Sequence, residues 1–197
     1  MSIPIRSLCV FAGANFGNKP EYREATQALG TLLAQSGIRC VYGAGNVGLM
    51  GALADACLAA GGEVIGVIPH SLVQHEVAHK GLTELRIVNT MHERKAMMAD
   101  LSDAFLALPG GLGTFEELFE VWTWSQLGIH RKPLGMLNVA GYYDPLVALV
   151  EHGVGEGFLR QQHRDSLIVD TDAARLLTVL REFKPAFTAK WIERDER

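Results

Sequence analysis

The sequence predicts a single-domain, Rossmann-like α/β fold, doubly wound, with a mainly parallel sheet and helices on both of its faces. Three observations lead to this prediction. Short apolar runs alternate with longer helical patterns along the chain, which is typical of consecutive βα units. Most of the short runs are apolar throughout rather than alternating, as in strands that are buried on both faces of a parallel sheet. The connections between them are short, and no repeat or linker interrupts the chain.

Seven strands and six helices are expected from these patterns. The strands are expected at residues 7–12, 38–42, 64–68, 85–88, 104–108, 134–139 and 167–169. The helices are expected at about residues 20–36, 47–60, 91–102, 114–127, 143–152 and 173–181. One domain over residues 1–185 accounts for these elements, and residues 186–197 are expected to form a C-terminal tail.

The bulk composition is that of an ordinary globular protein, with 197 residues of which 48% are hydrophobic and 20% charged. A net charge of −4 offers no global field to attract nucleic acid or an acidic membrane, so neither is expected as a partner. The N-terminus lacks a signal-peptide pattern, and no apolar stretch is long enough to span a bilayer. The three cysteines, Cys9, Cys40 and Cys57, are predicted to be buried free thiols. Together these features predict a cytoplasmic protein.

A glycine-rich turn, GAGNVG at residues 43–48, follows the second predicted strand and opens a helix. Gly43, Gly45 and Gly48 would allow the backbone to approach a phosphate at the helix N-terminus, so they are candidate substrate-binding residues. A tight strand-to-helix turn without a ligand would explain the pattern equally well. A dinucleotide site would also need an acid at the end of the next strand, but Glu63 lies at its start. An NAD enzyme is therefore disfavoured.

A second such turn, PGGLGTFEE at residues 109–117, follows the fifth predicted strand. Because the carboxyl ends of parallel strands meet at one edge of a sheet, both turns are expected to face the same crevice. Its candidate anion-binding residues are Gly110, Gly111, Gly113 and Thr114. Thr114 is expected to start a helix, and with Glu117 it forms a T-x-x-E capping box that would be purely structural. A second acid, Glu116, adjoins this pair and could face a sugar.

The predicted helix at residues 91–102 places a cation on an apolar stripe. Arg94 shares a helix face with Met91, Met98 and Leu101. Burying a guanidinium group is costly unless an anion meets it, which favours a bound ligand. Two alternatives stay open: the side chain snorkels along the methionines to water, or it forms a salt bridge to Glu116 or Glu117. Thr90 and Glu93 are expected to cap this helix.

The two segments together resemble the signature of a known family. MHERKAMM at residues 91–98, followed by PGGLGTFEE, resembles the Lonely Guy family of cytokinin riboside 5′-monophosphate phosphoribohydrolases, long labelled lysine decarboxylases. GNVGLMG at residues 45–51 and WTWSQLGIH at residues 122–130 match as well, and the resemblance runs from about residue 7 to residue 158. It implies a Rossmann-like homodimer that needs no cofactor. It also implies hydrolysis of the N-glycosidic bond of adenine-type nucleoside 5′-monophosphates, such as AMP and cytokinin riboside monophosphates, to free base and ribose 5-phosphate.

The resemblance also implies roles for individual residues by motif position. Arg94 and Glu117 would be the catalytic pair. The substrate-binding residues would be Glu76, Lys95, Glu116 and Thr123, together with the glycine turn at residues 110–114. The turn after the first strand departs from the family pattern, because Ala14 stands where serines are usual and cannot donate a hydroxyl hydrogen bond. Contacts from this turn to the base or phosphate are therefore in doubt.

The proposed chemistry follows from the charges involved. Cleaving an N-glycosidic bond builds positive charge on the ribose, which the carboxylate of Glu117 would stabilise while it orients or deprotonates water. Arg94 stays protonated, so it would hold the 5′-phosphate or donate to the departing base. A metal is not expected, because His75 and His79, at i and i+4, fit solvent-exposed histidines better than a zinc site.

Two other functions remain as alternatives to hydrolysis. The first is a non-catalytic carrier of a nucleotide or of the molybdenum cofactor on the same fold. The second is a lysine decarboxylase, which is disfavoured because the only lysine in the motifs, Lys95, lies in a phosphate-binding context.

The predicted helix at residues 114–127 bears on self-association. It is apolar over much of its circumference, which is typical of a helix buried on more than one side. Its apolar residues are Phe115, Leu118, Phe119, Val121, Trp122, Trp124 and Leu127. A homodimer is expected, although core packing alone would also account for such a helix.

Overall fold

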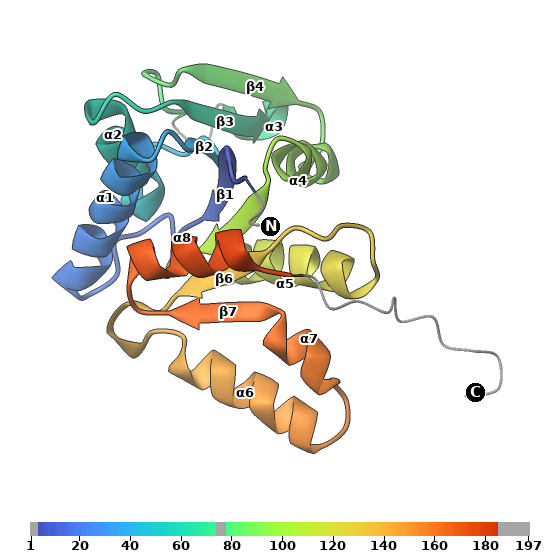
Figure 1. The fold of residues 1–197 in the computed structure, drawn as a ribbon. Coiled ribbons are helices and arrows are strands. Elements are labelled where there is room, and N and C mark those ends of the chain that lie inside the picture. The colour runs from blue at the N-terminus through green and yellow to red at the C-terminus, as the bar shows by residue number, and fades with distance from the viewer. Residues whose placement is uncertain (1–3, 74–77, 185–197) are drawn as a thin grey trace.

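In a computed structural model, which describes residues 4–73 and 78–184, the chain folds around one sheet of seven parallel strands (Figure 1). The strands are β1 (Ser7–Phe11), β2 (Arg39–Tyr42), β3 (Val64–Pro69), β4 (Glu84–Val88), β5 (Ala104–Ala107), β6 (Leu134–Leu137) and β7 (Leu167–Asp170). Their order across the sheet is β4-β3-β2-β1-β5-β6-β7. Strands β1 to β4 therefore follow one another in one direction across the sheet, and strands β5 to β7 follow one another in the opposite direction, starting beside β1. This leaves a topological switch point between β1 and β5.

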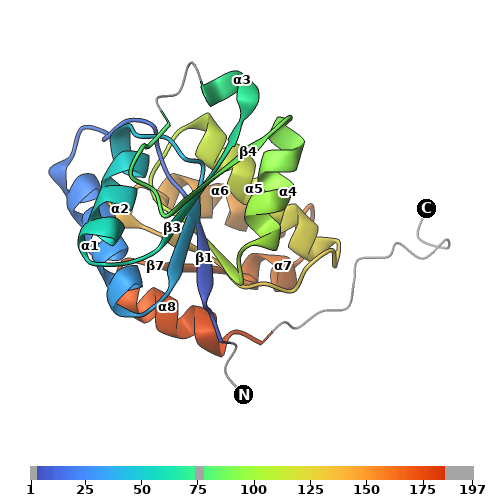
Figure 2. The same ribbon diagram turned by 90° about the horizontal axis from the view of Figure 1, so that it is seen from above.

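Helices cover both faces of the sheet, as predicted (Figure 2). The longer helices are α1 (Pro20–Gln35), α2 (Gly48–Ala59), α4 (Met91–Asp100), α5 (Leu112–Gln126), α6 (Asp144–Gly155) and α8 (Ala173–Glu182). Helices α1, α2 and α8 pack on one face, and α4, α5 and α6 on the other. Three short segments were not predicted: α3 (His70–Val73), α7 (Gln161–Asp165) and the 3₁₀ turn η1 (Val139–Gly141). Elements of three to five residues are too short to show a hydrophobic period.

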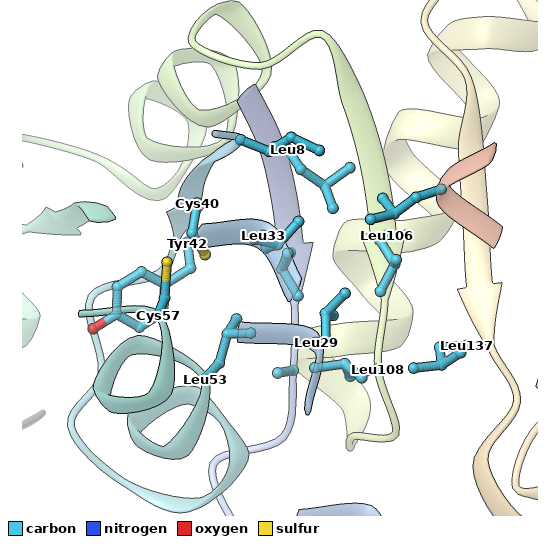
Figure 3. Packing of buried hydrophobic residues seen from close by; sticks show 14 of the residues in the cluster. Leu8, Leu29, Leu33, Cys40, Tyr42, Leu53, Cys57, Leu106, Leu108 and Leu137 are labelled. Atoms are coloured by element: carbon cyan, nitrogen blue, oxygen red, sulfur yellow. The ribbon is translucent and has the colours of Figure 1, made fainter. Parts of the chain in front are cut away.

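Burial on both sides explains the uninterrupted apolar strands. In β1, Leu8 and Val10 enter the core beneath α1 and α2, whereas Cys9 and Phe11 enter the core beneath α4 and α5. Figure 3 shows the first of these cores, where leucines from the strands meet leucines from the helices. The alternation of side chains along each strand thus gives the sheet two separate apolar cores.

All three cysteines lie within the two apolar cores. Cys9, Cys40 and Cys57 are all buried free thiols, as predicted. Within the two described segments, no helix is long and apolar enough to cross a membrane. The predicted tail at residues 186–197 lies outside the described residues.

Candidate active site

A cavity of about 390 Å³ opens at the carboxyl ends of β1 and β5, at the switch point of the sheet. The loop after β1 and the glycine turn after β5 both contribute to its walls. The lining residues are Ala12, Gly13, Ala14, Asn15, Phe16, Gly17, Tyr22, Leu49, Met50, Arg94, Pro109, Gly110, Gly111, Leu112, Gly113, Thr114, Glu117 and Tyr142. The structure therefore brings together Arg94, Glu117 and the second glycine turn, which were predicted from separate parts of the sequence.

The second glycine turn ends at the start of α5. This helix begins at Leu112 with Gly111 as its N-cap, two residues earlier than predicted. Thr114 is therefore inside the first turn and is not a cap, so the predicted capping box with Glu117 is wrong. Gly111 has the extended backbone that is usual for an N-cap residue (φ −97°, ψ −154°), and no side chain caps the helix.

The first turn of α5 faces the cavity with backbone donors. The amide of Phe115 donates to the carbonyl of Gly111, whereas within the described residues the amides of Leu112, Gly113 and Thr114 have no backbone acceptor. Free amides at a helix N-terminus attract an anion, because the helix dipole adds to their own positive ends. Thr114 itself is buried against Gly110, where an added Cβ would lie 2.1 Å from the threonine hydroxyl oxygen. Gly110 is thus required for this close approach.

Arg94 is almost completely buried, with 6% of its surface exposed, so its side chain does not snorkel to water. Its Nε donates to the carbonyl of Val67 at 3.2 Å, and one terminal nitrogen donates to the carbonyl of Gly43 at 3.0 Å. The helix start is as predicted, because the hydroxyl of Thr90 accepts from the amide of Glu93 at 3.1 Å. Two backbone carbonyls therefore hold the guanidinium group at the wall of the cavity.

The first glycine turn lies outside the lining of this cavity, in keeping with the alternative of a tight strand-to-helix turn without a ligand. Gly43, Gly45 and Gly48 do not line the cavity. Two amides in the first turn of α2, those of Leu49 and Met50, donate to the carbonyl of Gly13 at 3.0 and 3.3 Å, so the loop after β1 occupies this helix N-terminus.

Each of the three glycines allows a close contact instead. Gly43 adjoins the Arg94 guanidinium, Gly45 the Met50 side chain, and Gly48 the backbone at residues 14–15. A Cβ at any of them would lie within 2.5 Å of those atoms.

Glu117 lines the same cavity as Arg94, and the charges of both reach a thiol of the central strand. Burial raises the pKa of Cys9 well above its ordinary value, the charge of Glu117 raises it further, and the charge of Arg94 lowers it. Both charged groups therefore act on the same atom of β1. An acid and a permanent cation therefore both line the cavity at the carboxyl end of this strand.

Lys95 and Glu116 lie outside the cavity lining. The Lys95 ammonium, 9% exposed, forms ion pairs with Glu116 and, at 3.0 Å, with Glu120. Burial lowers the pKa of Lys95, but the hydrogen bonds that its ammonium donates to these carboxylates, together with their charges, hold the pKa above its ordinary value. Lys95, the residue after Arg94 in α4, therefore forms the ion pair with Glu116 that was one of the alternatives for Arg94.

Thr123, the last predicted substrate-binding residue that the structure describes, does not line the cavity. Thr123 is exposed on α5, and its hydroxyl donates to the carbonyl of Phe119 at 2.7 Å. Glu76 and His75 lie outside the described residues. His79 is buried, although a solvent-exposed position was expected. Its Nε2 contacts Asp55 at 2.9 Å, and its Nδ1 accepts from the Gly81 amide at 3.0 Å. No group of three potential metal-ligating side chains occurs among the residues that the structure describes.

An aromatic wall of the cavity was not predicted from the sequence. Tyr22 and Tyr142 meet edge to face with ring centroids 5.8 Å apart, and Phe115 stacks on Tyr142 at 6.4 Å. Tyr142 follows β6 closely, and β6 neighbours β5, so the rule that strand carboxyl ends share an edge points to it. The cavity thus has a polar side suited to an anion and an apolar side suited to a flat ring.

The fold and the cavity together define a class: a Rossmann-like α/β protein with an anion-suited cavity at the switch point of its sheet. Residues 50–180 match the family model described as "Possible lysine decarboxylase". The chain is 49% identical over 177 residues to a cytokinin riboside 5′-monophosphate phosphoribohydrolase of Rhodococcoides fascians, covering 89% of each protein. It is 48% identical over 182 residues to the rice protein of the same name, covering 92% of this chain and 75% of the relative.

The chain therefore belongs to the Lonely Guy family of proteins, whose matched model bears the lysine decarboxylase label. Solved structures of more distant proteins share its fold. The molybdenum cofactor binding protein of Rippkaea orientalis superposes with a TM-score of 0.67 at 19% identity, covering 92% of this chain and 98% of that one. The molybdenum cofactor carrier protein of Chlamydomonas reinhardtii gives 0.66 at 18% identity, with coverages of 89% and 96%. At these identities the likeness concerns the fold alone.

Proposed function

We propose that this chain is a phosphoribohydrolase. It would cleave the N-glycosidic bond of adenine-type nucleoside 5′-monophosphates, including AMP and cytokinin riboside monophosphates. The products would be the free base and ribose 5-phosphate. The observation that carries this proposal is the shared position of Arg94 and Glu117 in one cavity with the free amides of α5. Relatives at 48–49% identity that bear the name of this activity support it.

The parts of the cavity match the parts of a nucleotide. The free amides of Leu112, Gly113 and Thr114 would bind the 5′-phosphate, because an anion is stabilised at a helix N-terminus. The aromatic wall formed by Tyr22 and Tyr142 would receive the base, since flat rings stack favourably on aromatic side chains. The sugar would then lie between them, near Glu117.

The reaction follows from this placement. As the bond between the anomeric carbon and the base nitrogen breaks, positive charge develops on the ribose, and the Glu117 carboxylate would stabilise it. Water adds to the anomeric carbon, and Glu117 would accept the proton that this water loses. The electron pair of the broken bond leaves with the base, which takes up a proton. Arg94 would hold the phosphate or donate a hydrogen bond to the departing base, because its guanidinium group remains charged throughout.

We also propose roles for the other residues that the resemblance names. Glu76, Lys95, Glu116 and Thr123 would contact substrate, but the last three do not line the cavity of a single chain. The proposed homodimer is supported by the exposed side chains of Phe119 (38%) and Leu127 (49%), which lie on α5 and at its end, close to Thr123. Light scattering coupled to size exclusion would test the dimer, and a monomer at assay concentration would contradict it. The cytoplasmic location also remains a proposal.

The test of this function is a substrate panel with chromatographic detection of free base. AMP and isopentenyl-adenosine monophosphate are expected to be hydrolysed. Adenosine is not, because it has no phosphate for the free amides of α5 to bind, and ADP and ATP are not, because the proposed substrate carries one phosphate. Release of base from adenosine at the same rate would contradict the proposed phosphate recognition. Binding of AMP without release of base would contradict hydrolysis and favour a carrier.

A further inference from the structure

A short loop between β6 and α6 has an unusual and well-anchored backbone. Ala140 has φ 51° and Gly141 has φ 73°, both in the left-handed region that a residue with a Cβ rarely adopts. The side chain of Asn138 accepts from the Tyr143 amide at 2.7 Å and donates to Asp144 at 2.6 Å. These bonds hold the loop in one conformation, and that conformation directs two consecutive tyrosines back toward β5.

Both tyrosine hydroxyls bind the backbone that leads into α5. The hydroxyl of Tyr143 donates to the carbonyl of Leu108 at 2.7 Å, and the hydroxyl of Tyr142 donates to the carbonyl of Gly110. Between them, the carbonyl of Pro109 accepts from the amide of Gly13 at 3.1 Å. Three consecutive carbonyls of this turn are therefore held by donors from outside it, and two of the three donors are these tyrosines.

The bond from Tyr142 acts on the start of α5. The carbonyl of Gly110 and the amide of Gly111 belong to one planar peptide unit, so fixing the carbonyl fixes that plane. Gly111 is the N-cap of α5, and the free amides of residues 112–114 follow it directly. The hydroxyl also satisfies a carbonyl oxygen beside the cavity, whose negative end would otherwise repel an anion.

The ring of Tyr142 is held as firmly as its hydroxyl. Phe115 stacks on it at 6.4 Å, Tyr22 meets it edge to face at 5.8 Å, and Tyr143 does so at 5.1 Å. Such contacts restrict the ring to one orientation. The hydroxyl position is therefore determined before any ligand arrives, which is the condition for a site to bind without rearrangement.

We propose that Tyr142 is a positioning residue for phosphate binding in this enzyme. Its hydroxyl orients the N-cap of α5 through the Gly110 carbonyl, so that the free amides of the first turn meet the 5′-phosphate. The proposal rests on the proposed function for the identity of the ligand, but its geometry concerns any phosphate ester that enters the cavity.

Tyr142→Phe tests the proposal, because it removes only the hydroxyl and keeps the ring. We expect KM for AMP and the dissociation constant of ribose 5-phosphate to rise by about tenfold, with kcat changed by less than about threefold, since a contact to the unreacting phosphate contributes equally before and in the transition state. The matched control is Tyr42→Phe, which removes a buried hydroxyl at the end of β2 that does not line the cavity. It is expected to leave both constants unchanged.

The dissociation constant of ribose 5-phosphate separates this inference from the proposed function. Calorimetric titration with ribose 5-phosphate needs no turnover, so weaker binding to Tyr142→Phe supports the inference even if no base is released from AMP by the parent. Equal affinity of the parent and Tyr142→Phe for ribose 5-phosphate would overturn it. A lower melting temperature with unchanged KM and affinity would also overturn it, because the hydrogen bond from Tyr142 to Gly110 would then be purely structural.

Discussion

The guanidinium group of Arg94 donates a hydrogen bond to the backbone carbonyl of Gly43, 3.0 Å away, and fills the space beside the Cα of that glycine. A Cβ built on Gly43 would lie 1.9 Å from the donating nitrogen. The first glycine turn therefore contributes to the site indirectly: it leaves the space in which the cation lies.

Gly43→Ala is expected to inactivate the protein without unfolding it. The added methyl group must displace the Arg94 guanidinium by more than an ångström, and a displacement of that size costs about 100-fold in catalytic rate. The measurement is kcat/KM for AMP together with the melting temperature. Gly155→Ala, at the exposed end of α6 with open space around the added methyl, is the matched control and is expected to retain parent activity. Full activity of Gly43→Ala would show that Arg94 need not lie where the structure has it.

Lys95→Met is expected to destabilise the fold. It would leave the carboxylates of Glu116 and Glu120 near one another without their shared cation. We expect a loss of roughly 2 kcal/mol in the free energy of unfolding, less than for a fully buried pair because Glu116 is half exposed. Urea denaturation measures this loss. Arg39→Met, which breaks an exposed pair with Glu63, is the control and should cost less than about 1 kcal/mol. Equal costs for the two variants would contradict the structural role of Lys95.

His130 is expected to make stability depend on pH. Its Nε2 donates to the carbonyl of Val121 at 2.8 Å, and its Nδ1 accepts from the Lys132 amide at 3.1 Å, so the ring is neutral. Burial lowers the pKa of His130, and the charge of Lys132 lowers it further, although the bond to Val121 opposes them. As the pH falls through about 6.5, the unfolded chain takes up the proton first and the folded state loses stability.

Urea denaturation from pH 5 to pH 8 measures this effect. The stability of the parent should rise with pH more steeply than that of His130→Gln, and the difference should be confined to the window between the lowered pKa of the folded state and about 7.5. Parallel profiles for the two proteins would mean that the His130 pKa is the same in both states.

All three thiols are expected to be inert in the folded protein. Burial raises the pKa of Cys9 and Cys40 well above their ordinary value and that of Cys57 to about 11, so almost no thiolate is present at neutral pH. A colorimetric disulfide reagent should therefore detect no thiol in the native chain and three after denaturation. Rapid reaction of any thiol in the native state would contradict this burial.

Much of the fold could be predicted because its signals are local. The strand containing Cys9 and Phe11 is apolar on both faces, and this pattern alone predicts a buried parallel strand. The position of Arg94 on an apolar face of α4 followed from the spacing of its neighbours, although the burial of its side chain did not. These features need only the periodicity of one segment.

The unpredicted features depend on contacts between segments. The ion pairs of Lys95 with Glu116 and Glu120 were not predicted, because they depend on how α4 packs against α5. Tyr142 was overlooked because its bond to Gly110 spans 32 residues and depends on the left-handed backbone at Ala140. The start of α5 was misplaced because a run of glycines permits several starts, and the sheet edge selects one of them.

The most direct test of the proposed catalysis is the rate at which Glu117→Gln releases base from AMP. Loss of the carboxylate that stabilises the ribose charge and accepts the proton from water should lower kcat by about 1,000-fold, with the melting temperature unchanged within a few degrees. Glu63→Gln, an exposed acid that does not line the cavity, is the matched control and should act as the parent does. If Glu117→Gln releases adenine at the parent rate, Glu117 is not the catalytic acid–base group and the proposed mechanism is wrong.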